Sequence, residues 1–315
     1  MLFPASSEIR FEYEGEIIFR LPGFLCLRFV DAYYPQARQI DLEYGEIQDP
    51  TDLAAGPKMI DYLQTHVKWS MLEPFVTLSR DSKIRLAEMW NSKKDRIDGY
   101  SINFGLKQLP NELFRYIRFN EQYLSQLFRD NKFYLPSPNQ FNDPFDCSLD
   151  ETTRLASIAW GIGCFSAKNN DILMFSHYAN HHRGICFGVN PQELTNSMSD
   201  PKGIKAQIRP VWYFNKMPPL DFSHEPALCV TCKHDVWKYE EEYRLFLVRG
   251  ASPLPSGAYK FNPKSVTSVI FGCRASDRCI SFIKRVSSHL PDIKYFKASR
   301  QPNRFGVELL EIKKL

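Results

Sequence analysis

Apolar and polar residues alternate along the first part of the chain. Apolar positions alternate with charged ones over residues 8–13, and a second apolar run occupies residues 17–21. Two such runs joined by a short polar link predict a β-hairpin. The same region contains two more strand-like runs and two stretches of helical spacing, at residues 25–30, 39–44, 58–69 and 81–90. We therefore expect a β-rich N-terminal region with two or three helices.

From about residue 112 the pattern changes to short apolar runs separated by segments of helical spacing. This mixture favours an α+β fold, a mixed sheet with flanking helices. The runs that predict strands are residues 113–119, 161–166, 184–189, 237–248, 265–272 and 295–299. The segments that predict helices are residues 121–131, 170–182 and 279–290. Residues 98–110 are polar and irregular, so we predict a β-rich N-terminal domain over residues 1–105 and an α+β domain over residues 106–315.

The composition is that of a folded protein. Apolar residues make up 43% of the 315 positions and aromatic residues 14%, which supplies a substantial core. The net charge of +4, without any basic block, permits a phosphate-bearing partner but does not argue for one. We see no secretory signal and no apolar stretch long enough to span a membrane. The eight cysteines are scattered, so we expect reduced thiols, a cytoplasmic location and no membrane contact.

Three consecutive glutamates occur at the start of the predicted strand 237–248. In a strand, residues i and i+2 point to the same face, so Glu240 and Glu242 are expected to converge while Glu241 faces away. Trp237 and Tyr239 are expected to be buried residues that fix the strand's register. Because an ionised carboxylate removed from water needs a partner, two readings stay open. One is a wet edge strand with Arg244 as ion-pair partner, and the other is a site that uses two carboxylates.

Several blocks of the second domain resemble a bacterial family known as domain of unknown function 2971. The blocks are FRYIRFNEQYLSQLFRDNKFYLPSPNQFNDPFD, GIGCFSAKNNDILMFSHYANHHRGICFGV, KHDVWKYEEEYRLFLV and FNPKSVTSVIFG. They occur in this order across residues 112–312. The resemblance does not extend to the first hundred residues, and it implies no activity by itself.

The order of the blocks also resembles, more distantly, that of ADP-ribosyltransferases, which cleave the nicotinamide–ribose bond of NAD. This resemblance implies that Glu242 stabilises the ribosyl cation and that Glu240 orients the acceptor or acts as a base. It further implies that Arg118 holds the pyrophosphate or the adenosine ribose, and that Tyr178 and Phe165 sandwich the nicotinamide ring. Further candidate NAD contacts are Ser166, His177, Tyr116, Asn142 and Asp143.

Each of these residues also has a structural reading. Arg118 could be a surface cation, because Arg115 lies a turn away and nothing local separates the two. Phe165 lies in an apolar run and fits a core position. Ser166 fits a turn before the next helix, and the loop around Asn142 fits an ordinary turn before a proline.

The histidine and cysteine patterns give little support to a metal site. His177, His181 and His182 lie close together without an acidic residue at ligand spacing, and Cys229 and Cys232 form one pair without a second. No metal is expected. The chain also lacks a phosphate loop, a dinucleotide fingerprint and a nucleophile elbow. A nuclease-like toxin would need a carboxylate–lysine constellation, and the sequence shows none.

These observations lead to two function hypotheses. The first is an ADP-ribosyltransferase that uses NAD as substrate and modifies a nucleic acid or a protein. The resemblance implies that such an enzyme acts as a bacterial toxin or in anti-phage defence, and that an antitoxin or other inhibitory protein holds it in check. The alternative is a non-catalytic module that binds a nucleotide or a peptide in the same pocket.

Overall fold

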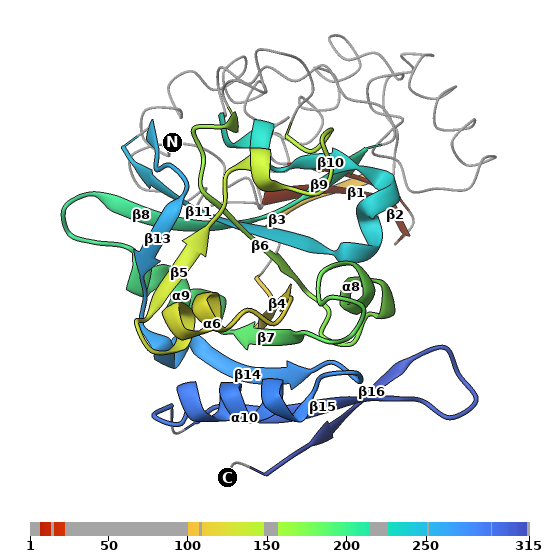
Figure 1. Cartoon of the computed structure of the whole chain (residues 1–315). Coiled ribbons are helices and arrows are strands. Elements are labelled where there is room, and N and C mark those ends of the chain that lie inside the picture. Colours follow the sequence, from red (N-terminus) through yellow and green to blue (C-terminus); the bar gives the residue numbers. More distant parts are fainter. Residues whose placement is uncertain are drawn as a thin grey trace. The chain divides into compact units, whose positions relative to one another are not determined.

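A computed structural model describes residues 7–13, 16–22, 100–106, 109–147, 157–214, 226–250, 252–290 and 292–313 (Figure 1). The chain divides into two compact units, one formed by Met1–Gln108 with Trp212–Leu228 and the other by Leu109–Val211 with Cys229–Leu315. The strands and helices predicted at residues 25–30, 39–44, 58–69 and 81–90 lie outside the described residues.

The described part of the first unit contains a three-stranded antiparallel sheet in the order β2-β1-β3. Its strands are β1 (Ser7–Tyr13), β2 (Glu16–Pro22) and β3 (Tyr100–Leu106). The predicted hairpin is confirmed, with a register shift between Phe11 and Glu12. The expectation of irregular structure at residues 98–110 is wrong, because β3 pairs with β1 along its whole length. The short strand β9 (Trp212–Phe214) also belongs to this unit.

The second unit is built on a nine-stranded mixed sheet. Its strand order is β12-β11-β6-β4-β7-β14-β15-β16, with β8 paired to β11. The pairing is antiparallel except between β14 and β15, which α10 connects. The strands are β4 (Leu113–Ile117), β6 (Ile162–Ser166), β7 (Ile185–Val189), β8 (Ile204–Pro210), β11 (Glu242–Arg249), β12 (Ser252–Pro253), β14 (Val266–Phe271), β15 (Lys294–Arg300) and β16 (Val307–Glu311). The α+β class is thus confirmed for this unit.

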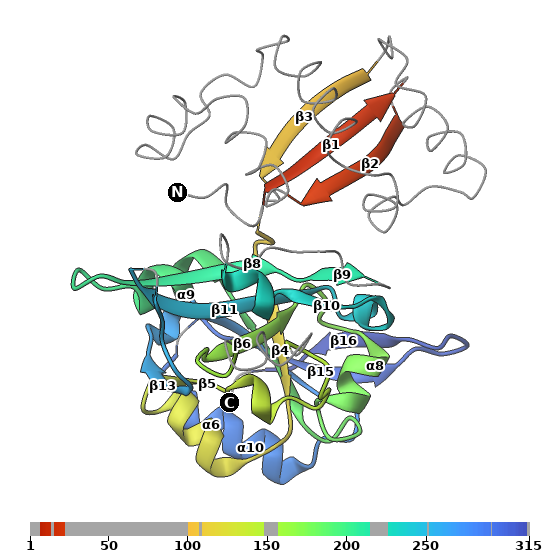
Figure 2. The same cartoon turned by 90° about the horizontal axis from the view of Figure 1, so that it is seen from above.

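Helices cover both faces of this sheet. One face packs against α6 (Glu121–Phe128), α9 (Pro191–Met198) and α10 (Asp277–Val286), together with the ribbon of β5 (Lys132–Leu135) and β13 (Gly257–Lys260). The other face packs against α8 (Ile172–His177). Helices α6 and α10 contact each other and lie side by side in Figure 2. The remaining described elements are β10 (Cys232–His234) and the 3-10 helices η3 (Pro138–Gln140), η4 (Pro226–Val230), η5 (Asp235–Glu240) and η6 (Pro263–Ser265).

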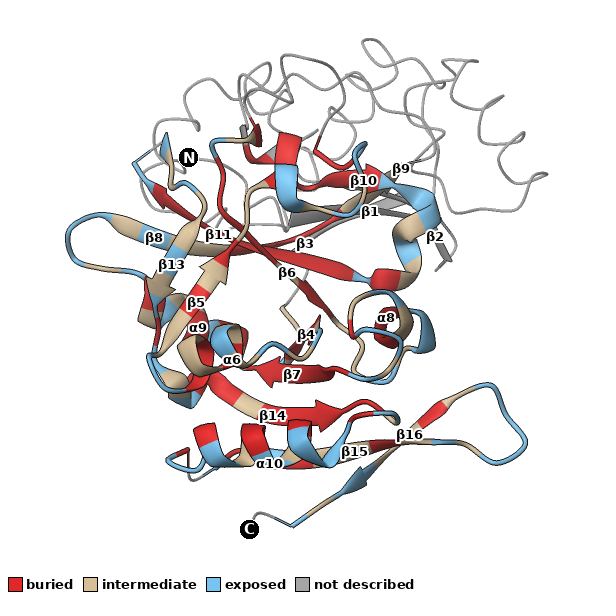
Figure 3. Cartoon of the chain, viewed as in Figure 1, coloured by how far each residue is buried: buried red, intermediate tan, exposed pale blue. Residues whose placement is uncertain are grey.

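The two faces follow from the alternation of side chains along each strand. In β7, Ile185 and Phe187 lie in the larger core while Cys186 lies in the smaller one with α8. The central strands β4, β6, β7 and β14 are mostly buried and contain no exposed residue, whereas β16 ends in exposed residues (Figure 3). No helix in the described part of the chain is long and apolar enough to cross a membrane.

The predicted strand over residues 237–248 begins later than its composition suggests. Residues 235–240 form η5, and β11 starts at Glu242. Trp237 and Tyr239 are therefore not strand residues, and both are only partly buried. The prediction that they anchor the strand is wrong, because the 3-10 turn removes them from the sheet's register.

Candidate functional site

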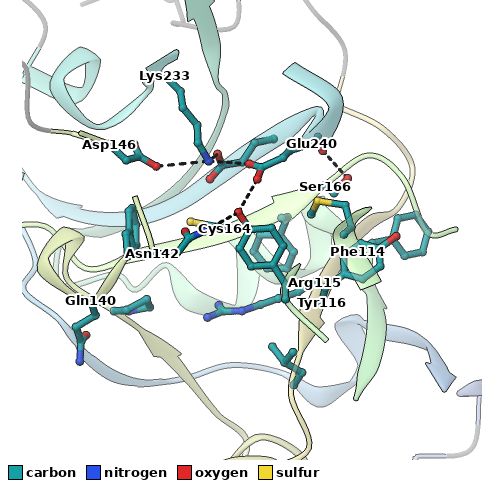
Figure 4. Close-up of a pocket in the computed structure, with 17 residues that line it drawn as sticks. Phe114, Arg115, Tyr116, Gln140, Asn142, Asp146, Cys164, Ser166, Lys233 and Glu240 are labelled. Carbon is teal, nitrogen blue, oxygen red and sulfur yellow. Dashed lines mark hydrogen bonds and ion pairs between the residues drawn. The ribbon is translucent and has the colours of Figure 1, made fainter. Parts of the chain in front are cut away.

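A cavity opens where β4 and β6 separate. These neighbouring strands pair at one position only, Phe114 with Ser166, whereas β6 pairs with β11 at five positions. The cavity has a volume of about 260 Å³. Its walls come from β4, β6, the segment between β5 and Asp146, the end of α8, and the junction of η5 with β11 (Figure 4). This volume is just below the roughly 300–1,000 Å³ of typical small-molecule sites.

Glu240 and Glu242 both line this cavity and converge as expected. The cause is not the strand alternation that we assumed. Glu240 is the last residue of η5, Glu241 has a left-handed backbone with φ of 44°, and Glu242 is the first residue of β11. The left-handed residue turns the chain, so that its own side chain points to solvent and pairs with Lys168 at 3.1 Å. Its neighbours Glu240 and Glu242 are 2% and 5% exposed.

Both glutamates bind the same buried ammonium group. Lys233 Nζ lies 2.7 Å from Glu240 Oε2, 3.1 Å from Glu242 Oε2 and 3.5 Å from Asp146 Oδ2 (Figure 4). Arg244 completes the group by donating to both oxygens of Glu242 at 2.8 and 3.0 Å and to Asp146 at 2.7 Å. We call these five residues, Asp146, Lys233, Glu240, Glu242 and Arg244, the ion cluster.

The ion cluster has an uneven charge balance. Its three carboxylates face two cations, so one negative charge is in excess when all three are ionised. Burial would raise the pKa of Glu242, but Arg244 and Lys233 outweigh burial and lower that pKa to about 2. Burial raises the pKa of Glu240, and Lys233 offsets this only in part while the Glu242 charge adds to it. The excess charge therefore belongs to Glu240.

Tyr178 and Asn142 extend the ion cluster towards the open side of the cavity. The Tyr178 hydroxyl donates to Glu240 Oε1 at 2.5 Å and accepts from Asn142 Nδ2 at 3.5 Å (Figure 4). Burial, and next the Glu240 charge, raise the pKa of Tyr178, so its hydroxyl stays protonated. Ser166 bonds to the backbone rather than to the ion cluster. Its hydroxyl donates to the Glu240 carbonyl at 2.6 Å and accepts from the Lys168 N–H. These bonds fix the backbone at Glu240.

Of the remaining predicted NAD contacts, Phe165 and Tyr116 border the cavity but are buried. Phe165 stacks on Phe133 in the larger core with ring centroids 5.6 Å apart. Tyr116 packs edge-on against Phe175, and its hydroxyl donates to the Lys168 carbonyl at 2.8 Å. Phe165 thus cannot sandwich a ring with Tyr178 without leaving the core.

His177 and Asp143 are not among the residues that line the cavity. The exposed His177 shares a 3.0 Å hydrogen bond with the Tyr239 hydroxyl and contacts the Trp237 ring. Asp143 accepts from the Phe145 N–H at 2.9 Å, which is a turn interaction.

Arg118, the predicted phosphate ligand, is exposed and follows the end of β4, outside the cavity lining. The arginine that does line the cavity is Arg115. Its guanidinium lies over the Phe133 ring at 4.8 Å and donates to the Tyr134 carbonyl at 3.5 Å, so it spans the opening between β4 and β5. The structure thereby separates two arginines that the sequence left equivalent.

Within the described residues, no three His, Cys, Asp or Glu side chains gather in a way that would hold a metal ion. An ammonium group occupies the centre of the three carboxylates instead. The expectation that the chain lacks a carboxylate–lysine constellation is wrong, because Asp146, Lys233 and the two glutamates form one. Cys229 and Cys232 are free buried thiols whose pKa values burial raises.

The predicted ion pair of Arg244 with the glutamates is confirmed by its bonds to Glu242. The wet edge strand is wrong, because β11 is buried and pairs with strands on both sides. Sequence reasoning missed Asp146 and Lys233. Asp146 lies in a loop and Lys233 in a short strand, and 98 positions separate Asp146 from Arg244. The burial of this ion pair had a signal in the sequence, since a charged residue within the apolar run of β11 implies a buried partner.

The fold and the cavity define an α+β protein with a small cavity beside a buried ion cluster. The family described as protein of unknown function (DUF2971) matches residues 174–245. The matched segment includes Tyr178, Lys233, Glu240, Glu242 and Arg244. No curated protein and no solved structure matches the chain, and none of these comparisons supports a resemblance to ADP-ribosyltransferases.

Proposed function

We propose that the cavity binds the nicotinamide–ribose end of NAD and that the protein transfers ADP-ribose to an acceptor. The observation behind this proposal is that three carboxylates share two cations beside a cavity that the ring of Tyr178 also lines. We assign the excess negative charge to Glu240, because burial raises its pKa and Lys233 offsets this only in part. Cleavage of the nicotinamide–ribose bond moves its electron pair onto the ring nitrogen and leaves a positive charge on the ribose. A carboxylate with uncompensated charge stabilises such a cation.

Glu240, rather than Glu242, takes the charge-stabilising role in this proposal. Both oxygens of Glu242 already accept bonds from Arg244, and Lys233 adds a third, so its charge is neutralised in place. Glu240 shares one ammonium with two other acids and points an oxygen towards Tyr178. Glu242 then acts as a positioning residue that holds Lys233.

Residues that line the cavity would bind the nicotinamide ring and the phosphates of NAD. Tyr178 offers a partly exposed ring for stacking on nicotinamide, and Arg115 offers a guanidinium for phosphate oxygens. The ribosyl cation takes an oxygen from the acceptor or from water, and the displaced proton goes to solvent. The cavity of about 260 Å³ accommodates the nicotinamide riboside part, and the rest of the dinucleotide extends outside it.

One observation favours a second candidate, a non-catalytic nucleotide-binding module. All four oxygens of Glu240 and Glu242 accept hydrogen bonds within the protein, as in a purely structural network. A protein that cleaves NAD also threatens its own cell, so an inhibitory partner belongs to the first candidate and not to the second.

Incubation with NAD separates the two candidates. The first predicts nicotinamide release, measured by liquid chromatography, and a fall of roughly two to three orders of magnitude in Glu240→Gln. Glu241→Gln, which changes an exposed neighbour of the same type, is the matched control and retains the parent's rate. NAD binding by calorimetry without nicotinamide release, in the parent itself, would establish the binding module instead.

A further inference from the structure

Four neighbouring strands of the large sheet, β4, β7, β14 and β15, have one terminus each at the same edge of it. At this edge β4 and β14 end with Ile117 and Phe271, β7 begins with Ile185, and β15 continues to Arg300. Register aligns these strands, because Ile117 pairs with Ile185, Ile185 with Phe271, and Phe271 with Lys297. One to three positions beyond each of these residues, on the same side, the chain has an arginine. We call these residues the arginine row: Arg118, Arg183, Arg274 and Arg300.

Contacts between the loops confirm that this edge is compact. The N–H of Arg274 donates to the His182 carbonyl at 2.9 Å, and the N–H of Gly272 donates to the Gly184 carbonyl at 3.0 Å. Besides burial, the charges of Arg274 and Arg300 lower the pKa of His182. The fields of both arginines therefore reach the same imidazole.

No acidic side chain in the described part of the chain forms an ion pair with the arginine row. All four arginines are exposed, and none forms an ion pair with any residue that the structure describes. Glu308, which register places opposite Ser299 on β16, is also without an ion pair among those residues. Like charges held side by side repel, so an anion bound between them lowers the free energy of the folded state.

The turn that presents Arg183 is itself strained. Asn180, His181 and His182 have consecutive left-handed backbones with φ of 48°, 53° and 66°. Left-handed conformations in residues other than glycine cost free energy and cluster at functional sites. Here the strain places a histidine–arginine segment at the edge where the other arginines lie.

An aromatic side chain lies at the end of the row. Phe305 is fully exposed in the hairpin loop between β15 and β16, which projects from the sheet (Figure 3). This loop follows Arg300 directly and also contains Arg304. An exposed phenylalanine beside cations is the arrangement that stacks on nucleobases.

We propose that the arginine row and Phe305 bind a single strand of nucleic acid. Neighbouring β-strands lie about 4.8 Å apart, so a row across four of them extends for roughly 14 Å along the sheet edge. That length exceeds a single pyrophosphate and suits several successive phosphates of one nucleic-acid chain. Strand β4 lines the cavity up to Ile117, and Arg118 of the row follows directly. The bound nucleic acid therefore passes the cavity and is the acceptor of the proposed transfer. This acceptor role rests on the proposed function, whereas the binding does not.

Fluorescence anisotropy with a labelled single-stranded 20-mer DNA tests the binding. Each lost phosphate contact weakens binding to a single strand about five-fold at 100 mM salt, so R183A/R274A/R300A should weaken it about 100-fold. The salt dependence of the triple variant should be shallower by about two units of slope. Phe305→Ala, at a fully exposed site, should weaken binding about five-fold or more with an unchanged melting temperature.

The matched control removes three exposed cations at the start of β8 and the end of β11, K202A/K205A/R249A; this loop lies at the opposite end of the unit from the β15–β16 hairpin (Figure 1). It should leave binding within about twofold of the parent, because it changes the net charge equally but leaves the row intact. Equal weakening in both triple variants, or no binding of the 20-mer by the parent at 50 mM salt, would overturn the proposal. The proposal would also be overturned if R183A/R274A/R300A lost NAD binding but still bound the DNA like the parent. Absence of nicotinamide release with intact DNA binding would refute only the proposed function.

Discussion

Glu240→Gln and Glu242→Gln should have opposite effects on stability, although the two residues share Lys233. Glu242→Gln removes the carboxylate that neutralises Arg244, a fully buried guanidinium. The pKa of Glu242 falls from 4.5 to about 2 on folding, which corresponds to about 3 kcal/mol of stability at neutral pH. Removal of one partner from a buried pair typically costs about 3–5 kcal/mol, which is the same size.

Glu240→Gln instead removes the excess charge of the ion cluster. Lys233 retains Glu242 at 3.1 Å and Asp146 at 3.5 Å, and the new amide oxygen still accepts from Tyr178. The raised pKa of Glu240 means that its charged form opposes folding at neutral pH. We therefore expect Glu240→Gln to change the free energy of unfolding by no more than about 1 kcal/mol, towards greater stability.

Thermal unfolding followed by circular dichroism at pH 7 measures both variants. For a unit of this size, about 3 kcal/mol lowers Tm by roughly 6–12 °C, so Glu242→Gln should melt well below the parent. Glu240→Gln should melt at or above the parent's temperature. If Glu240→Gln is destabilised as much as Glu242→Gln, then Glu240 does not carry the excess charge of the ion cluster.

Three further predictions concern pH, packing and the hydroxyl of Tyr178. Because the folded pKa of Glu242 is depressed, its contribution is complete above pH 4.5 and disappears as pH falls towards 2, so melts across this range should show the parent and Glu242→Gln converging. Phe165→Ala should cost about 3–5 kcal/mol in urea unfolding, because Phe165 is a stacked core residue; a loss below 1 kcal/mol would contradict that position. Tyr178→Phe retains the ring but not the bond to Glu240, so KM for NAD should change little while kcat falls about tenfold in the nicotinamide assay; a change in KM alone would refute this role.

Local patterns predicted the fold of the second unit better than its site. The strands β6, β7 and β14 were predictable, because central strands buried on both faces have nearly continuous apolar sequences. The strands β8 and β16 were not predicted, since both mix exposed and buried positions without clear alternation. In the first unit, β3 was missed because its polar flanks suggested a linker.

The convergence of Glu240 and Glu242 was predicted, but from an incorrect backbone. Strand alternation and a left-handed residue at Glu241 both bring side chains i and i+2 together, and composition alone does not distinguish them. Lys233 and Asp146 were not predictable, because their proximity depends on how distant segments pack. The choice between Arg115 and Arg118 likewise depended on where β4 ends, which is the least certain property of any sequence-based assignment.

The long separation within the ion cluster has a consequence for the order of folding. Asp146 and Arg244 are 98 positions apart, so formation of their bond closes a long loop that contains β6, β7, α9 and β8, and we expect it to form late. Until then, hydration of these charges opposes their burial, and the cluster is expected to be absent from the folding transition state. Interactions of this kind affect the rate of unfolding and leave the rate of folding almost unchanged. The residues that shape the cavity would then also determine how long the folded unit survives before it opens.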